Sequence, residues 1–141
     1  MVKKILAPGN DSTPTSFALL VLRLWLGLTM LFEHGLVKVN GFSNLAPYFP
    51  DPLHLGRNLS MGLVTFAETG GALLLALGLI TRLGALTLVI DLGVAFFMVH
   101  KTMDSGELAF VYLAGYVTLL IAGGGSFSLD KALFGKGGSG K

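Results

Sequence analysis

The chain lacks cysteine and is poor in charged residues. Without thiols it cannot carry out its own thiol-disulfide exchange, hold an iron-sulfur cluster on thiolates or attach a c-type haem covalently. Charged residues make up only 13% of the 141 residues, against 52% hydrophobic ones, and the mean hydropathy is +0.73. A soluble domain of this size needs a larger charged fraction to cover its surface. The composition therefore predicts an integral membrane protein.

The basic residues do not form a stripe, although the formal net charge is +2 and the pI is about 9.0. They are scattered near the ends of the hydrophobic segments, which argues against a nucleic-acid partner. The partners that the sequence favours are the lipid bilayer, a membrane or redox protein, and a second copy of the chain.

Four hydrophobic segments come close to the roughly 20 residues that a helix needs to cross a bilayer. They cover about residues 16–37, 59–80, 83–100 and 107–122. Because the connections are short, consecutive helices should be antiparallel neighbours, which predicts an all-α, up-down-up-down four-helix bundle over residues 16–133. Residues 1–15 form an N-terminal segment that does not resemble a signal peptide, and 134–141 resemble a flexible linker or a cloning remnant.

Basic residues flank the segments unequally. Six of them, Lys3, Lys4, Arg82, Lys131, Lys136 and Lys141, are expected at the end that carries both termini, and three, Lys38, Arg57 and Lys101, at the other end. The positive-inside rule then predicts a bacterial inner-membrane protein with both termini in the cytoplasm. The long connection rich in Pro and Asn, about residues 40–58, should form an interfacial lid that could dock a partner.

Three ionisable residues lie deep in the predicted helices, where an unpaired charge is costly. Counted from the cytoplasmic end, Arg23 is roughly 10 Å deep, Asp91 about 12 Å and Glu68 about 18 Å. We expect an ion pair between Arg23 and Asp91. One cation cannot neutralise two carboxylates, so Glu68 should be protonated much of the time. Such a group could relay protons or hold a quinone or a sulfur oxyanion near Arg23; the alternative is a structural ion pair that fixes helix register.

A second polar cluster is expected at the other end, around His34 and His100. Level histidines on two helices could bind a metal or haem, or serve as a proton exit. They are interfacial, however, and no HxxxH or ExxH pair accompanies them, so we assign no metal ligands.

The candidate site residues follow from these positions. On the first helix Arg23, His34 and Lys38 share one stripe, and Tyr112 and Tyr116 of the fourth helix offer hydroxyl groups nearby. The candidate catalytic residues are Glu68 and Asp91. The candidate cofactor-binding residues are Arg23, His34, Lys38, His100, Tyr112 and Tyr116.

Four sequence stretches together resemble the DoxX family of small bacterial membrane proteins. They are LRLWLGLTMLFEHGLVKVNGF (22–42), FAETGGALLLALGLITRLGAL (66–86), FFMVH (96–100) and GGGSFSLD (123–130). The resemblance spans about residues 17–133 and implies a four-helix membrane fold.

The resemblance also implies hypotheses about function. Members are described as membrane subunits of redox systems, including a small subunit associated with a terminal quinol oxidase, a thiosulfate:quinone oxidoreductase and a membrane partner in thiol-stress defence complexes. The first hypothesis is a subunit, part of a quinone-linked oxidoreductase complex, that positions a quinone or a sulfur substrate. The chain itself shows no evident cofactor, and quinone is the candidate. The alternatives are a non-enzymatic assembly or chaperone-like subunit and, with less support, a small transporter or proton channel.

Overall fold

The computed structural model describes residues 12–135, and within this range it has helices and no strands. Four helical stretches are long and apolar enough to cross a membrane: Thr13–Tyr48, Arg57–Leu77, Thr81–His100 and Met103–Ala122. The predicted all-α four-helix membrane fold is therefore confirmed.

The first span is longer than the predicted 16–37. It consists of α2 (Thr13–Thr29), a π-helical segment η1 (Met30–Gly35), α3 (Leu36–Leu45) and a short 3-10 turn η2 (Ala46–Tyr48). Ser12 caps its start by accepting a hydrogen bond from the backbone N–H of Thr15. Polar residues after Val37 predicted a loop, but helical propensity is a weak prior that the surrounding structure can override. The loop that follows is correspondingly short, residues 49–56.

The remaining spans are joined by tight turns. The second comprises α4 (Arg57–Phe66), the π-helical segment η3 (Ala67–Gly71) and α5 (Ala72–Leu77). The third comprises α6 (Thr81–Val94) and the π-helical segment η4 (Ala95–His100). The fourth is α7 (Met103–Ala122), and a short helix α8 (Leu129–Phe134) follows it. The turn between the second and third spans is at 78–80, where Gly78 has a φ of 70° that suits a residue without a side chain.

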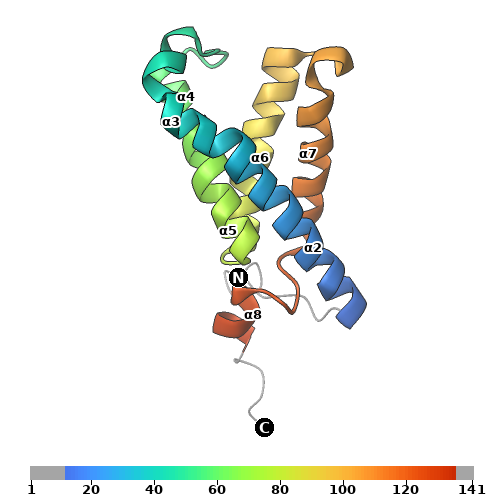
Figure 1. The fold of residues 1–141 in the computed structure, drawn as a ribbon. Helices are drawn as coiled ribbons and strands as arrows, with labels where there is room; N and C mark the ends of the chain where they lie inside the picture. Colours follow the sequence, from blue (N-terminus) through green and yellow to red (C-terminus); the bar gives the residue numbers. More distant parts are fainter. Residues whose placement is uncertain (1–11, 136–141) are drawn as a thin grey trace.

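The four spans run in alternating directions (Figure 1). We call the end with the start of α2 and with α8 the terminal end, and the end with residues 49–56 the loop end. Leu75, Leu88, Tyr116 and Leu119 form a fully buried core between the helices. Toward the loop end, α3 and α4 diverge from η4 and α7, and the bundle opens (Figure 1).

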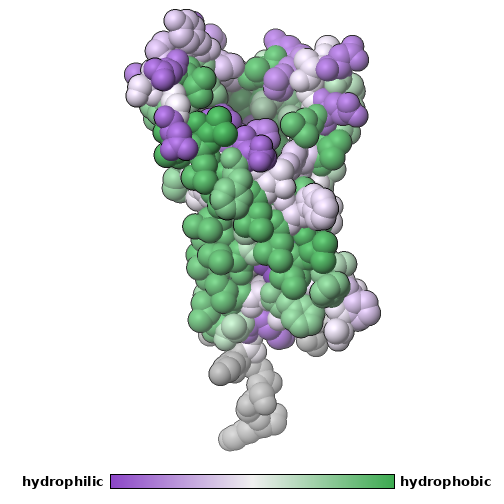
Figure 2. Space-filling model, viewed as in Figure 1, coloured by the Kyte–Doolittle hydropathy of each residue, from purple (hydrophilic) through white to green (hydrophobic). Residues whose placement is uncertain are grey.

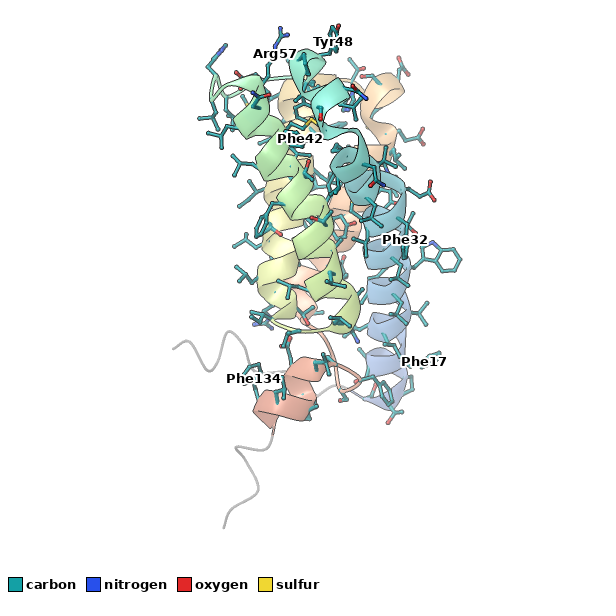
Figure 3. All side chains as sticks on the ribbon, turned by 60° about the vertical axis from the view of Figure 1, so that its left-hand side comes forward. Phe17, Phe32, Phe42, Tyr48, Arg57 and Phe134 are labelled. Carbon is teal, nitrogen blue, oxygen red and sulfur yellow. The ribbon has the colours of Figure 1, made fainter. Side chains whose placement is uncertain are left out.

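The outer surface of the bundle is largely apolar. On the face that Figure 2 shows, hydrophobic side chains cover the middle of the spans, and hydrophilic side chains lie at the ends and between the diverging helices at the loop end. Phe17 and Phe32 of the first span point away from the bundle (Figure 3), and their side chains are 58% and 57% exposed. Lipid tails are the solvent that fits this surface, which supports a bilayer as the environment of the four helical spans.

Candidate functional site

A cavity of about 710 Å³ lies in the loop-end half of the bundle. All four spans and residues of the loop contribute to its walls, which are mostly apolar. Six of the eight predicted site residues line it: His34, Lys38, Glu68, Asp91, His100 and Tyr112. The two that do not are Arg23 and Tyr116.

An ion pair between Lys38 and Glu68 is the polar centre of this cavity. The Lys38 Nζ donates to Glu68 Oε2 at 2.5 Å, and the two side chains are only 18% and 7% exposed. Helical side chains lean toward the N-terminus of their helix. Lys38 is therefore directed from the loop end into the bundle, where Glu68 lies. Helix α3 positions the cation and η3 the carboxylate.

Asp91 faces the same cavity from α6. Its Oδ2 atom is buried and has no hydrogen-bond partner among residues 12–135. The charges of Glu68 and Lys38 both act on it. The inner part of the cavity thus holds one cation and two carboxyl groups, one of which lacks a partner of its own.

π-Helical segments carry three of the six predicted site residues that line the cavity. His34 lies in η1, Glu68 in η3 and His100 in η4. π-Bulges are rare and occur often at functional sites, because they turn side chains off the regular helical register. Hydrophobic periodicity alone did not predict these segments, and no signal in the sequence marked them.

Of the two tyrosines among the predicted site residues, Tyr112 lies at the cavity and Tyr116 lies in the core. His34 meets Tyr112 edge to face, with 6.1 Å between ring centroids, and Tyr112 stacks on Tyr116 at 5.9 Å. The Tyr116 hydroxyl donates to the carbonyl oxygen of Leu26 at 3.1 Å and is buried in the core. Tyr116 therefore lies behind the cavity, whereas Tyr112 lines it.

The predicted ion pair between Arg23 and Asp91 is wrong. Arg23 is fully buried near the terminal end and donates to three main-chain carbonyl oxygens, those of Leu75 at 3.3 Å, Ala76 at 3.1 Å and Phe127 at 2.8 Å. The predicted depths assumed that all helices run parallel to one another. In the structure Gly27 packs at the level of Ala76, and Arg23 lies one turn further toward the terminal end and leans that way.

Asp130 is a structural residue that the sequence-based site did not include. Its Oδ1 accepts from the Ile80 N–H at 2.6 Å, and its Oδ2 accepts from the Thr81 N–H at 2.9 Å and the Thr81 hydroxyl at 2.7 Å. Its carboxylate caps the start of α6, where the N–H groups lack helical partners. It also interacts electrostatically with Arg23. The closing GGGSFSLD stretch could have indicated this role. Arg23, Asp130 and Thr81 together form what we call the terminal clamp.

No cluster of three or more His, Cys, Asp or Glu side chains suited to a metal ion occurs within residues 12–135. His34 and His100 both line the cavity, but His100 is exposed at its edge. The assignment of no metal ligands remains a prediction.

The loop over the cavity is held by Asp51. Its carboxylate accepts from Ser60 Oγ at 2.6 Å and from the N–H groups of Leu55 and Gly56 at 2.9 Å each. The neighbouring Arg57 donates to the carbonyl oxygen of Pro47 across the loop; Figure 3 shows Arg57 and Tyr48 at the loop end. Loop residues such as Phe49 and Leu55 line the cavity, so this segment covers the site.

Acid should loosen this loop. The Ser60 hydroxyl above all, and then the two backbone donors, lower the pKa of Asp51 below the 3.8 of a free aspartate. A carboxyl whose folded pKa is depressed contributes order above its unfolded pKa and loses it as the pH falls through the folded value. We expect the N–H groups of Leu55 and Gly56 to lose hydrogen-exchange protection below about pH 3.8. Ser60→Ala should move this loss to higher pH; an unchanged midpoint would contradict the assignment.

The fold and the cavity define the class of this protein: a four-helix integral membrane protein with a ligand-sized cavity in one half of the bundle. The family model for DoxX matches residues 18–101, more than half of the chain, and the chain belongs to the DoxX family. It is also 32% identical over 123 residues to an uncharacterized protein of Haemophilus influenzae, covering 80% of this chain and 81% of that protein. No solved structure matches it significantly.

Proposed function

We propose that the protein is a membrane subunit of a redox system that holds a quinone headgroup in the loop-end cavity. The observation that carries the proposal is the Lys38–Glu68 pair beside Asp91 in a mostly apolar cavity of about 710 Å³. Small-molecule sites of this kind are apolar clefts of roughly 300–1,000 Å³ with a few converging polar groups.

The polar groups suit a neutral headgroup with oxygen atoms. Lys38 uses one N–H on Glu68, and an ammonium has three donors, so it can also donate to a quinone carbonyl. The Tyr112 side chain of α7 adds an aromatic ring to the cavity wall, and its hydroxyl contacts Thr29. Electrons would be handled by a partner protein and by the quinone itself.

A sulfur oxyanion fits this site less well. Glu68 already takes the charge of Lys38, and Asp91 has no partner within the part of the chain that the structure describes. Arg23, the cation expected to hold an anion, is committed to carbonyl groups at the terminal end. An anionic ligand would therefore have to share the charge of Lys38 with Glu68.

The binding test uses the protein in lipid nanodiscs titrated with decylubiquinone. Lys38→Met should weaken binding on the order of tenfold or more, because a hydrogen bond from a charged donor contributes about 1.5–3 kcal/mol. Glu68→Gln should weaken binding as well and abolish quinone-linked turnover in the folded protein. Glu107→Gln, an exposed carboxylate outside the cavity, is the matched control and should bind as the wild type does. Unchanged affinity in Lys38→Met, or displacement of the quinone by thiosulfate, would contradict the proposal.

We propose that the loop end faces away from the cytoplasm in a bacterial inner membrane. Lys38, counted among the three basic residues of that end, is half-buried and paired with Glu68, which leaves Arg57 and Lys101 there. Four of the six basic residues predicted at the other end, Lys3, Lys4, Lys136 and Lys141, lie outside the described residues 12–135. Counted along the sequence, these six outnumber the two that remain, as the positive-inside rule requires. A cysteine that replaces Tyr48 should be labelled by a membrane-impermeant reagent in intact cells. Failure to label that cysteine would indicate the opposite orientation.

A further inference from the structure

Two cavities meet at His34. The inner one, of about 710 Å³, contains Glu68 and Asp91, and a more open outer one, of about 340 Å³, contains Glu33 and Tyr48. His34 and Lys38 line both, together with Phe49 and Pro50 of the loop. In Figure 2 hydrophilic side chains gather in this region of the loop end. The boundary between the buried carboxyl groups and the outside is therefore made partly of an imidazole.

Asp91 lies on the inner side of this boundary. Its Oδ2 is buried without a hydrogen-bond partner in the described range 12–135, and an uncompensated carboxylate in such a place is costly. A proton on Asp91 removes that cost. The polar side chains that line both cavities, His34 and Lys38, offer a proton a path between Asp91 and the outer cavity.

We propose that His34 relays protons between Asp91 and water at the loop end. The imidazole accepts a proton from Asp91 at one ring nitrogen, through water in the inner cavity, and releases a proton from the other nitrogen to the outer cavity. Asp91 is left as the carboxylate, and the reverse sequence reprotonates it. The inference deepens the proposed function and rests on it for its purpose, because the reduction or oxidation of a quinone moves protons as well as electrons.

The other groups around His34 fit this role less well. Lys38 is engaged with Glu68, and the Tyr112 ring packs edge-on against the imidazole from α7. His100, on η4, lines the inner cavity but not the outer one. Glu33 lies in the outer cavity and is exposed, so it is a natural acceptor after His34.

The experiment follows hydrogen-deuterium exchange by infrared spectroscopy on the full chain in nanodiscs without quinone. The band observed is the carboxylic-acid stretch that Asp91→Asn removes. In His34→Gln this band should exchange on the order of 10²-fold more slowly, since a positioned acid-base group contributes typically 10²–10⁴-fold to proton transfer. His54→Gln, which changes an exposed histidine of the loop that lines neither cavity, should exchange at the wild-type rate.

The proposal is overturned if His34→Gln exchanges at the wild-type rate, or if Asp91→Asn removes no carboxylic-acid band. Should His34→Gln fail to fold, judged by circular dichroism, His34→Phe replaces it, because it keeps a ring against Tyr112. Slow exchange in a protein that does not bind decylubiquinone would contradict only the proposed function. Quinone binding with unaltered exchange would contradict only the relay.

Discussion

Replacing Arg23 by methionine is expected to lower the free energy of unfolding by at least about 3 kcal/mol, because each hydrogen bond from a charged donor contributes about 1.5–3 kcal/mol. The side chain is fully buried, and its guanidinium donates to carbonyl oxygens from two separate parts of the chain, at Ala76 and Phe127. Methionine fills similar space but supplies no donor. The carbonyl groups are then left buried and unpaired, and the negative end of α5 loses its cation. An unfolding titration in mixed micelles measures the change.

The comparison variants separate this effect from a general loss of packing. Arg23→Lys keeps the charge but cannot span the same carbonyl groups, so its loss should be intermediate. Trp25→Leu, two residues along the same helix, changes a side chain that is 73% exposed to lipid and should leave stability nearly unchanged. An Arg23→Met protein as stable as the wild type would show that the carbonyl contacts contribute little, and the terminal clamp would lose its main support.

The polar groups of the bundle form two sets with different roles, one in the terminal clamp and one at the loop-end cavity. At the terminal end, Arg23, Thr81 and Asp130 satisfy backbone groups at the helix ends and close the bundle. At the loop end, the helices diverge, and Asp91 keeps an oxygen that no group in residues 12–135 pairs with. The terminal end thus satisfies its buried polar groups internally, whereas the loop end holds a mostly apolar cavity with a few polar groups.

Hydropathy was sufficient to predict the fold. Each predicted span corresponds to an observed one, because a segment that must satisfy its backbone in lipid has the helix as its simplest structure. The exact ends were less predictable. The polar residues around Asn40 read as a loop, yet the helix continues to Leu45 and on through a 3-10 turn.

The sequence singled out Glu68 and Asp91 because ionisable groups are rare in spans, and His34 and Lys38 because they share one stripe of the first helix. The structure brings these four side chains to one cavity, and their role there stays a prediction. The predicted pairing of Arg23 with Asp91 was wrong because depths counted along the sequence ignore helix tilt. They also ignore the lean of side chains toward the helix N-terminus. The sequence predicted Lys38 at the membrane interface, whereas its side chain reaches inward to Glu68.

Gly35 controls how closely the two halves of the ion pair approach. It lies in η1 where the first span crosses η3, and a Cβ built on it would be 2.5 Å from the Glu68 carbonyl oxygen and 2.8 Å from the Glu68 carbonyl carbon. These are backbone atoms of the residue that pairs with Lys38, so a rotamer change cannot relieve the clash. The two helices must separate.

Gly35→Ala is therefore expected to destabilise the bundle by about 1–3 kcal/mol, as overpacking typically does. It should also weaken decylubiquinone binding, since separation of η1 from η3 moves Glu68 away from Lys38. Gly62→Ala is the matched control: it is also a helical glycine, a Cβ added to it would have nothing within 4 Å, and the change should stabilise by about 0.4–1 kcal/mol through the unfolded chain. Unfolding titrations and quinone titrations on both variants give the comparison. If the two alanine variants behaved alike, the close crossing at Gly35 would not be what sets the geometry of the site.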